Sequence, residues 1–281
     1  MEVVQLADPA EFLARAGLLL LADEARHNLI LGLAGTLRDQ PGRYPDFELW
    51  LVEDAGNVVG AALRTLPFRL VLAQPATTAA LPALADVLED LPGVVGGVPE
   101  AREFADAWRA KTGAVAHVDS EQGVYALDRL EPARATTGSR RAAGERDREL
   151  LLHWLQAFSN EALGEEADDA ELQRMIDMRV AGHLDYGLVL WEDEGRPASV
   201  TGFGSPTPTG IRIGPVYTPP ELRGRGYASA LVAEVSQAHL DAGRRFCFLY
   251  TNLANPTSNK IYVDLGYRRV CDSLQLSFHP A

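Results

Sequence analysis

Cysteine is scarce in this chain of 281 residues, which contains only Cys247 and Cys271. Neither lies in a CxxC motif, and neither has a second Cys or a His close enough in sequence to complete a metal site. The sequence therefore predicts no bound metal and no disulfide framework. We expect a cytoplasmic protein with reduced thiols.

Long apolar runs and excess basic charge are also lacking. The most apolar early run, AGLLLLA (residues 16–22), is far short of the roughly 18–20 residues of a membrane span. The N-terminus lacks the basic segment and apolar stretch of a secretory signal. Acidic residues outnumber basic ones by 39 to 26, which gives a formal net charge of -13. Because such a charge repels nucleic acids and anionic lipid surfaces, we expect neither as a partner, and we expect a monomer or a homodimer.

The length and the 47% of apolar residues are typical of two globular domains. Between them, EPARATTGSRRAAGERD (residues 131–147) has almost no large apolar residue and is predicted to be a linker. The expected domains are therefore residues 1–130 and residues 148–281.

The first half begins with helix signals. Asp8 is an expected N-cap, Pro9 takes the first helical position, and two helices should extend to about Leu37. Residues 47–74 have the pattern of three strands joined by turns, and two further helices with a short strand between them should follow. Gly113 should end the second of these helices, and residues 114–130 are predicted to form a closing hairpin.

The second half repeats this order. Two helices, the second capped at Asp168 or Asp169, precede a hairpin that turns at residues 193–196 and then a third strand, TGIRIGPVYT. A long helix, a strand, a short helix and a last strand or pair of strands follow. The repeated order predicts two copies of one α+β unit.

One stretch of the second half, VYTPPELRGRGYASALVAEVSQ (residues 216–237), is typical of an anion site. The first amides of a helix have no intrahelical partner, and the helix dipole adds positive potential there. Gly224 and Gly226 have no Cβ to keep an anion away from the backbone, and Arg223 and Arg225 add charge.

Two familiar phosphate loops fit this stretch poorly. A P-loop requires a Lys that is missing here. A dinucleotide fingerprint requires a third glycine where Ser229 stands, and also a parallel sheet. A third pattern, Arg/Gln-x-x-Gly-x-Gly/Ala, is matched by Arg223, Gly226 and Ala228.

A second motif follows at the expected spacing. In NLANPTSNKIYVDLGYRRV, Asn255, Ser258, Tyr262, Gly266 and Tyr267 match the pattern Asn-x-x-Ala/Ser-x-x-x-Tyr-x-x-x-Gly-Phe/Tyr. With both motifs in this order, most of residues 148–278 resembles the GCN5-related N-acetyltransferase (GNAT) family. The first half matches neither motif and would be a degenerate GNAT-like copy.

The resemblance implies a tandem acyl-CoA N-acyltransferase fold of the α+β class, with a mixed, mostly antiparallel sheet whose central strands splay apart in each half. It implies acetyl-CoA as co-substrate. Its pyrophosphate would be cradled by the Gly-rich turn and its pantetheine arm would lie along the preceding strand. The implied coenzyme-binding residues are Val216, Tyr217 and Thr218 for pantetheine, Arg223, Gly224, Arg225, Gly226, Tyr227, Ala228 and Ser229 for pyrophosphate, and Asn255 and Ser258.

The resemblance also assigns catalytic chemistry. Tyr262, with an ordinary pKa near 10, would protonate the leaving thiolate, and a backbone N–H near Leu249 or Tyr250 would hold the thioester carbonyl. The chain departs from the family's frequent use of a Glu on the third strand as base. Alternative candidates for a base are Glu161, Glu165, Glu166, Asp185 and a water held by Asn252.

These expectations give an N-acetyltransferase that acetylates a primary amine on a small molecule or a peptide by direct attack in a ternary complex. No Cys or Ser stands beside a His in a way that predicts an acyl-enzyme. The negative charge favours cationic acceptors. Two alternatives stay open: acetylation of the amine of a thiol metabolite, as in tandem mycothiol synthases, and a non-catalytic sensor of acyl-CoA.

Overall fold

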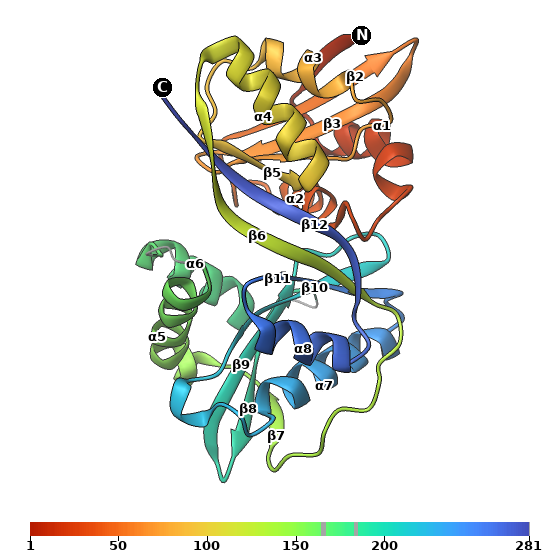
Figure 1. Ribbon diagram of the computed structural model, residues 1–281. Coiled ribbons are helices and arrows are strands. Elements are labelled where there is room, and N and C mark those ends of the chain that lie inside the picture. Colours follow the sequence, from red (N-terminus) through yellow and green to blue (C-terminus); the bar gives the residue numbers. More distant parts are fainter. Residues whose placement is uncertain (164–166, 183–184, 281) are drawn as a thin grey trace. The chain divides into compact units, whose positions relative to one another are not determined.

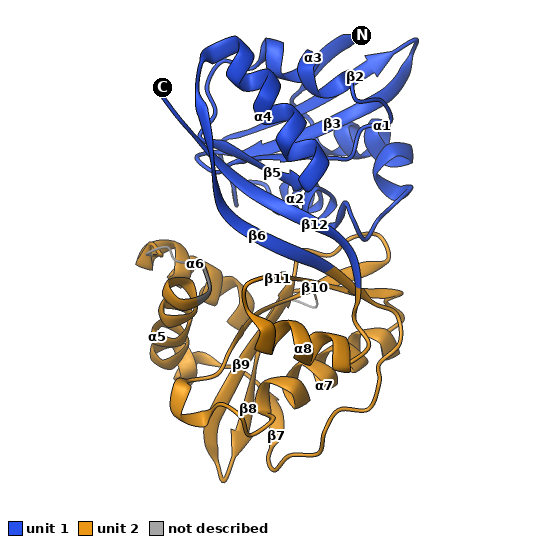
Figure 2. Ribbon diagram, in the orientation of Figure 1, with its two compact units in different colours: residues 1–124, 269–281 blue, residues 125–268 orange. Residues whose placement is uncertain are grey.

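The computed structural model describes residues 1–163, 167–182 and 185–280. It divides the chain into two compact units, shown in Figure 2. Unit 1 consists of residues 1–124 and 269–281, and unit 2 of residues 125–268. Among the described residues, no helix combines the length and apolarity needed to cross a bilayer.

Unit 1 is built on a mixed sheet (Figure 1). Its strand order is β1-β2-β3-β4-β5-β12-β6. Neighbours from β1 to β4 are antiparallel, β4 and β5 are parallel, and β5 and β12 are antiparallel. The strands are β1 (Glu2–Leu6), β2 (Phe47–Asp54), β3 (Asn57–Thr65), β4 (Leu70–Leu72), β5 (Gly93–Gly97), β6 (Val115–Leu127) and β12 (Arg268–His279).

Two pairs of helices cover the two faces of this sheet. Successive side chains of a strand point to opposite faces, and apolar residues occur on both faces. Leu49 and Leu51 pack with α1 and α2 on one face, whereas Val52 packs with α3 and α4 on the other. The helices are α1 (Pro9–Leu21), α2 (Asn28–Asp39), α3 (Ala80–Val87) and α4 (Val98–Thr112). Asp8 caps α1 through a 2.8 Å bond from the Ala10 amide, and Gly113 ends α4 in the left-handed conformation, as predicted.

Unit 2 has the same kind of layered arrangement (Figure 1). Its strand order is β11-β10-β9-β8-β7, in which β10 and β11 are parallel and the other neighbours antiparallel. The strands are β7 (Ser139–Ala142), β8 (Gly187–Asp193), β9 (Arg196–Gly204), β10 (Gly210–Tyr217) and β11 (Phe246–Asn252).

The helices of unit 2 again take opposite faces. Leu188 and Leu190 pack with α5 and α6, whereas Val189 and Trp191 pack with α7 and with residues of α8. The helices are α5 (Arg148–Phe158), α6 (Asp169–Val180), α7 (Tyr227–Asp241) and α8 (Pro256–Asp264). A π-helical turn, Ser159–Leu163, extends α5, and Asp168 caps α6.

One expectation about local structure is wrong, and two strands were not predicted. Residues 114–130 do not form a hairpin, because β6 runs unbroken through the polar segment His117–Gln122. The strands β1 and β7 were not foreseen, since both are short and lie at the edges of their sheets. Of the two options predicted for the end of the chain, a strand or a pair of strands, the structure has the single strand, β12, of 12 residues.

The division of the chain also differs from the expected ranges. β12 pairs with β5, from Ser273 opposite Gly97 to Ser277 opposite Gly93, so the end of the chain belongs to unit 1. The expected linker contains β7, which pairs with β8 and belongs to unit 2. Composition missed both because a strand's partner is not encoded next to it in the sequence.

Candidate active site

The candidate site in unit 2 is built where two parallel strands separate. β10 pairs with β11 only at Gly210, Ile211 and Arg212, although β10 continues to Tyr217 and β11 to Asn252. Beyond Arg212 the two strands therefore offer facing backbone edges that are not paired with each other. Leu249 lies on this part of β11, and Val216 and Tyr217 lie on this part of β10. An extended, amide-bearing ligand can pair with such an edge as an additional strand would.

A β-bulge changes the direction of the side chains along β10. Its register with β9 shifts between Ile213 and Val216, so Ile213 faces the α7 side whereas Tyr217 packs on the α5 side, near Trp154. Arg179 of α6 lies on the bulge and donates from Nη1 to the Gly214 carbonyl at 3.0 Å. Gly202 makes room for this guanidinium, since a Cβ there would stand 2.1 Å from Nη1. Sequence patterns gave no signal for this role of Arg179.

The Gly-rich loop, residues 223–226, leads from β10 into α7. Gly224 and Gly226 have φ values of +78° and +89°, a region that other residues rarely adopt. Gly226 is the N-cap of α7 and has no side chain to accept from the first-turn amides of Tyr227, Ala228 and Ser229. Asp8, Asp168 and Asn255 do accept such bonds at their helices. The start of α7 is therefore suited to an external anion.

Arg223 is held by unit 2 itself. Its Nε donates to the Thr218 carbonyl at 2.9 Å, and its Nη2 donates to Glu161 at 2.5 Å. The other carboxylate oxygen of Glu161 accepts from the Tyr217 hydroxyl at 2.9 Å. The hydrogen bond from Arg223 lowers the pKa of Glu161, which makes this carboxylate a weaker base than an ordinary Glu.

The second motif lies on β11 and α8. Asn255 is the N-cap of α8, and its Oδ1 accepts from the Ser258 amide at 3.1 Å. The Asn255 side chain therefore has an established structural use, which leaves its Nδ2 as the group that could contact a ligand. Ser258 is half-buried one turn before Tyr262.

Tyr262 is buried in the apolar cluster that also contains Leu249 and Tyr227. Its ring makes an edge contact with Tyr267, with ring centroids 5.9 Å apart. Burial raises the pKa of Tyr262 to about 12. The phenol is therefore protonated at neutral pH and can only donate a proton, as a general acid must.

Of the other candidates for a base, the structure describes the contacts of Asp185 and Asn252. Asp185 forms an ion pair with Arg244, and Oδ1 of Asn252 accepts from the Ala254 amide at 2.8 Å. Glu165 and Glu166 lie outside the described residues. No cluster of three metal-ligating side chains occurs in the part of the chain that the structure describes.

Unit 1 also has two parallel strands that separate, β4 and β5, but there a side chain of the protein, His27, bonds to the backbone beside them. β4 pairs with β5 only at Leu70 and Val71, and the Gln74 amide, two residues after the end of β4, donates to His27 Nε2 at 3.0 Å. The other ring nitrogen of His27 lies 2.9 Å from the Leu20 carbonyl. Burial lowers the pKa of His27, in keeping with a neutral ring that accepts at Nε2.

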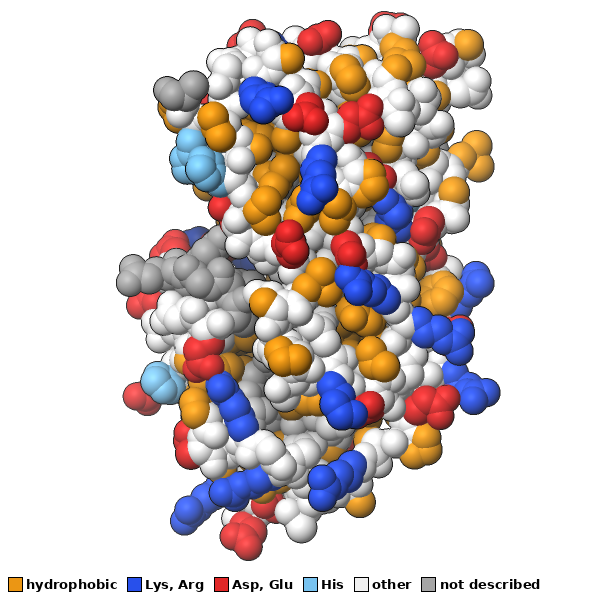
Figure 3. Space-filling view, in the orientation of Figure 1, with side chains coloured by type: hydrophobic (Ala, Val, Ile, Leu, Met, Phe, Trp, Pro, Cys, Tyr) orange, Lys and Arg blue, Asp and Glu red, His pale blue; other side chains and the backbone are white. Residues whose placement is uncertain are grey.

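Charge of either sign is dispersed on the face shown in Figure 3, where Lys and Arg side chains alternate with Asp and Glu side chains. Elsewhere in the described residues, ion pairs join Arg140 to Glu234 and Lys260 to Asp264. The net charge of -13 is therefore not concentrated in one acidic surface on this face.

Comparison with protein families supports the two-motif interpretation. Residues 148–267 match the model of the Acetyltransferase (GNAT) family. This range contains the separated strands, the Gly-rich loop and Tyr262. No curated protein matched the chain.

Solved structures resemble the chain over nearly its whole length. A Drosophila protein has a TM-score of 0.70 at 12% identity, with 99% of this chain and 98% of that chain covered. A tandem GNAT protein from the clavulanic acid biosynthesis pathway has a TM-score of 0.61 at 18% identity, with the same coverage. A GNAT-family acetyltransferase from Colwellia psychrerythraea has 0.58 at 14%, with 99% and 100% covered. At these identities the likeness shows the fold alone, an α+β fold that extends over both units.

Proposed function

Because residues 148–267 form a domain of the GNAT acetyltransferase family, we propose that this chain transfers the acetyl group of acetyl-CoA to a primary amine on a small molecule or a peptide. The observation that carries the proposal is the separation of β10 from β11 directly before the Gly-rich loop. An extended pantetheine arm and a pyrophosphate need these two features in this order. Neither alternative, a thiol-metabolite acetyltransferase or a sensor, is favoured by the comparisons.

In the proposed complex, pyrophosphate binds the first-turn amides of α7 and the loop of residues 223–226. Val216, Tyr217 and Thr218 lie along the pantetheine arm, with Asn255 and Ser258 near the coenzyme. The thioester carbonyl accepts from a backbone N–H near Leu249 or Tyr250, and this bond strengthens as negative charge develops on the oxygen.

The proposed reaction is a direct attack. A neutral amine forms a C–N bond to the thioester carbon, the C–S bond breaks, and the thiolate takes the proton of the Tyr262 hydroxyl. The raised pKa of Tyr262 keeps that proton available at neutral pH. The amine gives up its own proton to water, since Glu161 and Asp185 are both engaged with arginines.

The test measures thiol release from acetyl-CoA with a panel of polyamines, aminoglycosides and Lys-containing peptides. The wild type should turn over at least one of them. Tyr262→Phe should bind CoA as the wild type does and lose about 10²- to 10⁴-fold in kcat, the usual contribution of a general acid. A wild type that binds CoA but releases no thiol with any amine would contradict the proposed transfer.

A further inference from the structure

Residues 133–142, here called the strap, lie within the expected linker, and Thr136 of this segment contacts the Gly-rich loop. The strap follows residues 129–131, where the Glu131 amide donates to the Leu265 carbonyl at the end of α8. It ends as β7 on the edge of the unit 2 sheet. The chain is therefore held beside α8 just before the strap and by β8 at the end of the strap.

The closest tie is to the Gly-rich loop. The Thr136 hydroxyl donates to the carbonyl of Arg225 at 2.8 Å. A Cβ placed on Gly226 would lie 3.6 Å from Thr136 Cβ, so Thr136 lies beside the N-cap residue of α7. The orientation of the Arg225–Gly226 peptide determines where the following amides point, and Thr136 holds its carbonyl from outside the loop.

A second tie fixes the first residue of α7. The Tyr227 hydroxyl donates to Asp193 Oδ2 at 2.5 Å, at the turn between β8 and β9. The Thr137 side chain also hydrogen-bonds to this carboxylate, and both bonds lower the pKa of Asp193. The Thr137 carbonyl accepts from Trp191 Nε1 at 2.9 Å. Neighbouring strap residues thus hold the loop and the helix start.

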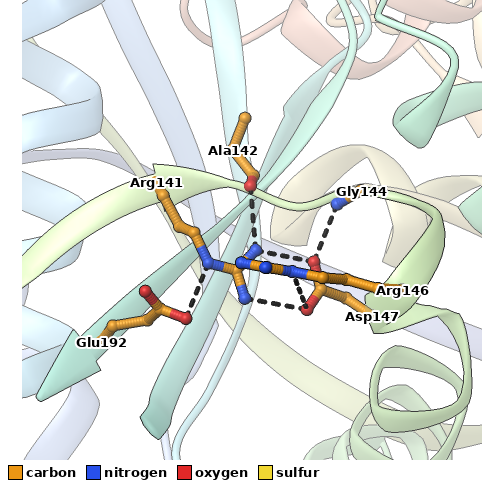
Figure 4. A network of polar contacts seen from close by, with 6 residues as sticks. All are labelled: Arg141, Ala142, Gly144, Arg146, Asp147 and Glu192. Carbon is orange, nitrogen blue, oxygen red and sulfur yellow. Dashed lines mark hydrogen bonds and ion pairs between the residues drawn. The ribbon is translucent and has the colours of Figure 1, made fainter. Parts of the chain in front are cut away.

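The strap is itself anchored at its end (Figure 4). Arg141 makes a bidentate contact with Asp147 at 2.6 and 2.8 Å and an ion pair with Glu192 of β8 at 2.7 Å. Asp147 also accepts from the Gly144 amide at 2.8 Å. At Gly138 the strap passes so close to β8 that a Cβ would stand 2.2 Å from the Glu192 carbonyl oxygen. Such a segment has little freedom to move away from the loop.

We propose that the strap is a positioning element for coenzyme binding, in which Thr136 and the Thr137–Asp193 pair hold the amides at the start of α7 in their binding orientation before the ligand arrives. This inference rests on the proposed function, because it assumes that the Gly-rich loop receives the pyrophosphate of CoA. It adds Thr136 and Thr137, which lie outside both sequence motifs and outside the matched residues 148–267. Preorganisation of this kind raises affinity by lowering the ordering cost of binding.

The test is calorimetric titration of the full chain with CoA, together with steady-state kinetics. Thr136→Val removes the hydroxyl and keeps the shape, and it should raise the Kd for CoA by about 2- to 10-fold, the range expected for one net hydrogen bond. The KM for acetyl-CoA should rise with it, whereas kcat and the KM for the amine should not change. Thr136→Ser keeps the hydroxyl and should restore wild-type affinity.

Thr112→Val is the matched control, since the Thr112 hydroxyl also donates to a backbone carbonyl, that of Trp108 at 2.8 Å, in unit 1. It should leave the Kd for CoA unchanged. An unchanged Kd in Thr136→Val, or no rescue by Thr136→Ser, would overturn the strap proposal alone. A wild type that does not bind CoA would overturn the proposed function together with it.

Discussion

The two units share one feature, a pair of parallel strands that separate after a short paired stretch, but they differ in what lies beside it. Each has a pair of parallel strands that stay paired for only two or three residues, β4 with β5 and β10 with β11. In unit 2 the longer strand β10 runs on into a glycine loop and the bare start of a helix. In unit 1, β4 ends at Leu72, and His27 bonds to the Gln74 amide just beyond it. The two units therefore differ in whether a side chain of the protein bonds to the backbone next to the separated strands.

Charged side chains add to this difference. In unit 1, Glu100 in the first turn of α4 receives both 2.8 and 2.9 Å contacts from Arg26, and a Cβ on Gly97 would stand 2.1 Å from Glu100 Oε2. The space at this helix start is therefore occupied by an internal ion pair. In unit 2 the space beside Gly224 is open, with nothing within 4 Å of a Cβ placed there.

The largest effect should come from closing the unit 2 loop. Gly226→Val places a β-branched residue at φ +89°, so the loop must change conformation and the α7 amides turn away from the ligand. We expect the Kd for CoA to rise at least about tenfold, measured by calorimetry. Gly113→Val is the control, since Gly113 has φ +78° at the end of α4. Equal weakening by both variants would show that only general strain is being measured.

Removing the His27 side chain tests the role that this residue has in unit 1. His27→Ala leaves the Gln74 amide and the Leu20 carbonyl without their partner, and it should lower the free energy of unfolding by about 1–3 kcal/mol. Urea denaturation of this variant, with the exposed His153→Ala as control, measures the loss. Calorimetry should still find one CoA per chain. Two CoA per wild-type chain would contradict the view that unit 1 is filled.

The His27 ring also gives unit 1 a pH dependence with a definite sign. Its pKa is lowered in the folded state, so the stability that depends on the neutral ring is present above the ordinary value near 6.5 and is lost as pH falls through the folded pKa. The unfolding free energy of the wild type should therefore fall towards acidic pH more steeply than that of His27→Ala. Parallel curves between pH 7 and 4 would contradict this role.

Tyr262 makes the stability of unit 2 depend on pH in the alkaline range. Its pKa is raised from 10 to about 12, so the stability linked to its buried neutral form is present below pH 10 and is lost between pH 10 and 12. The loss should reach about 2 kcal/mol over this window. Denaturation curves at pH 9 to 12 should separate the wild type from Tyr262→Phe, which lacks the ionisable group. Coincident curves would indicate an exposed phenol.

The smallest effect is expected at Glu161, which is about half exposed along with its partner Arg223. Exposed ion pairs contribute little, so Glu161→Gln should change the KM for acetyl-CoA by less than about threefold. The same variant tests whether Glu161 acts as a base, because replacement of a general base would lower kcat by about 10²-fold or more. Steady-state kinetics distinguish these outcomes, and a large loss of kcat would restore Glu161 as the base.

The sequence by itself determined the local parts of this protein. Asp8 and Asp168 start helices, Gly113 ends one, and the turn at residues 193–196 joins two strands, because caps and turns depend on residues only a few positions apart. The two motifs likewise indicated the part of the chain, residues 148–267, that matches the GNAT family model. They could do so because each motif is a short, local run of residues.

Only the tertiary structure decided which distant segments meet. It joined β12 to unit 1, made the expected linker a strap beside Gly226, and set Arg179 over Gly202 at the bulge of β10. It also paired Glu161 with Arg223, which lowers the pKa of a residue that the sequence offered as a base. These contacts join residues from 23 positions apart, Arg179 and Gly202, to 184 positions apart, Gly93 and Ser277. Neither periodicity nor motif spacing carries information over such distances.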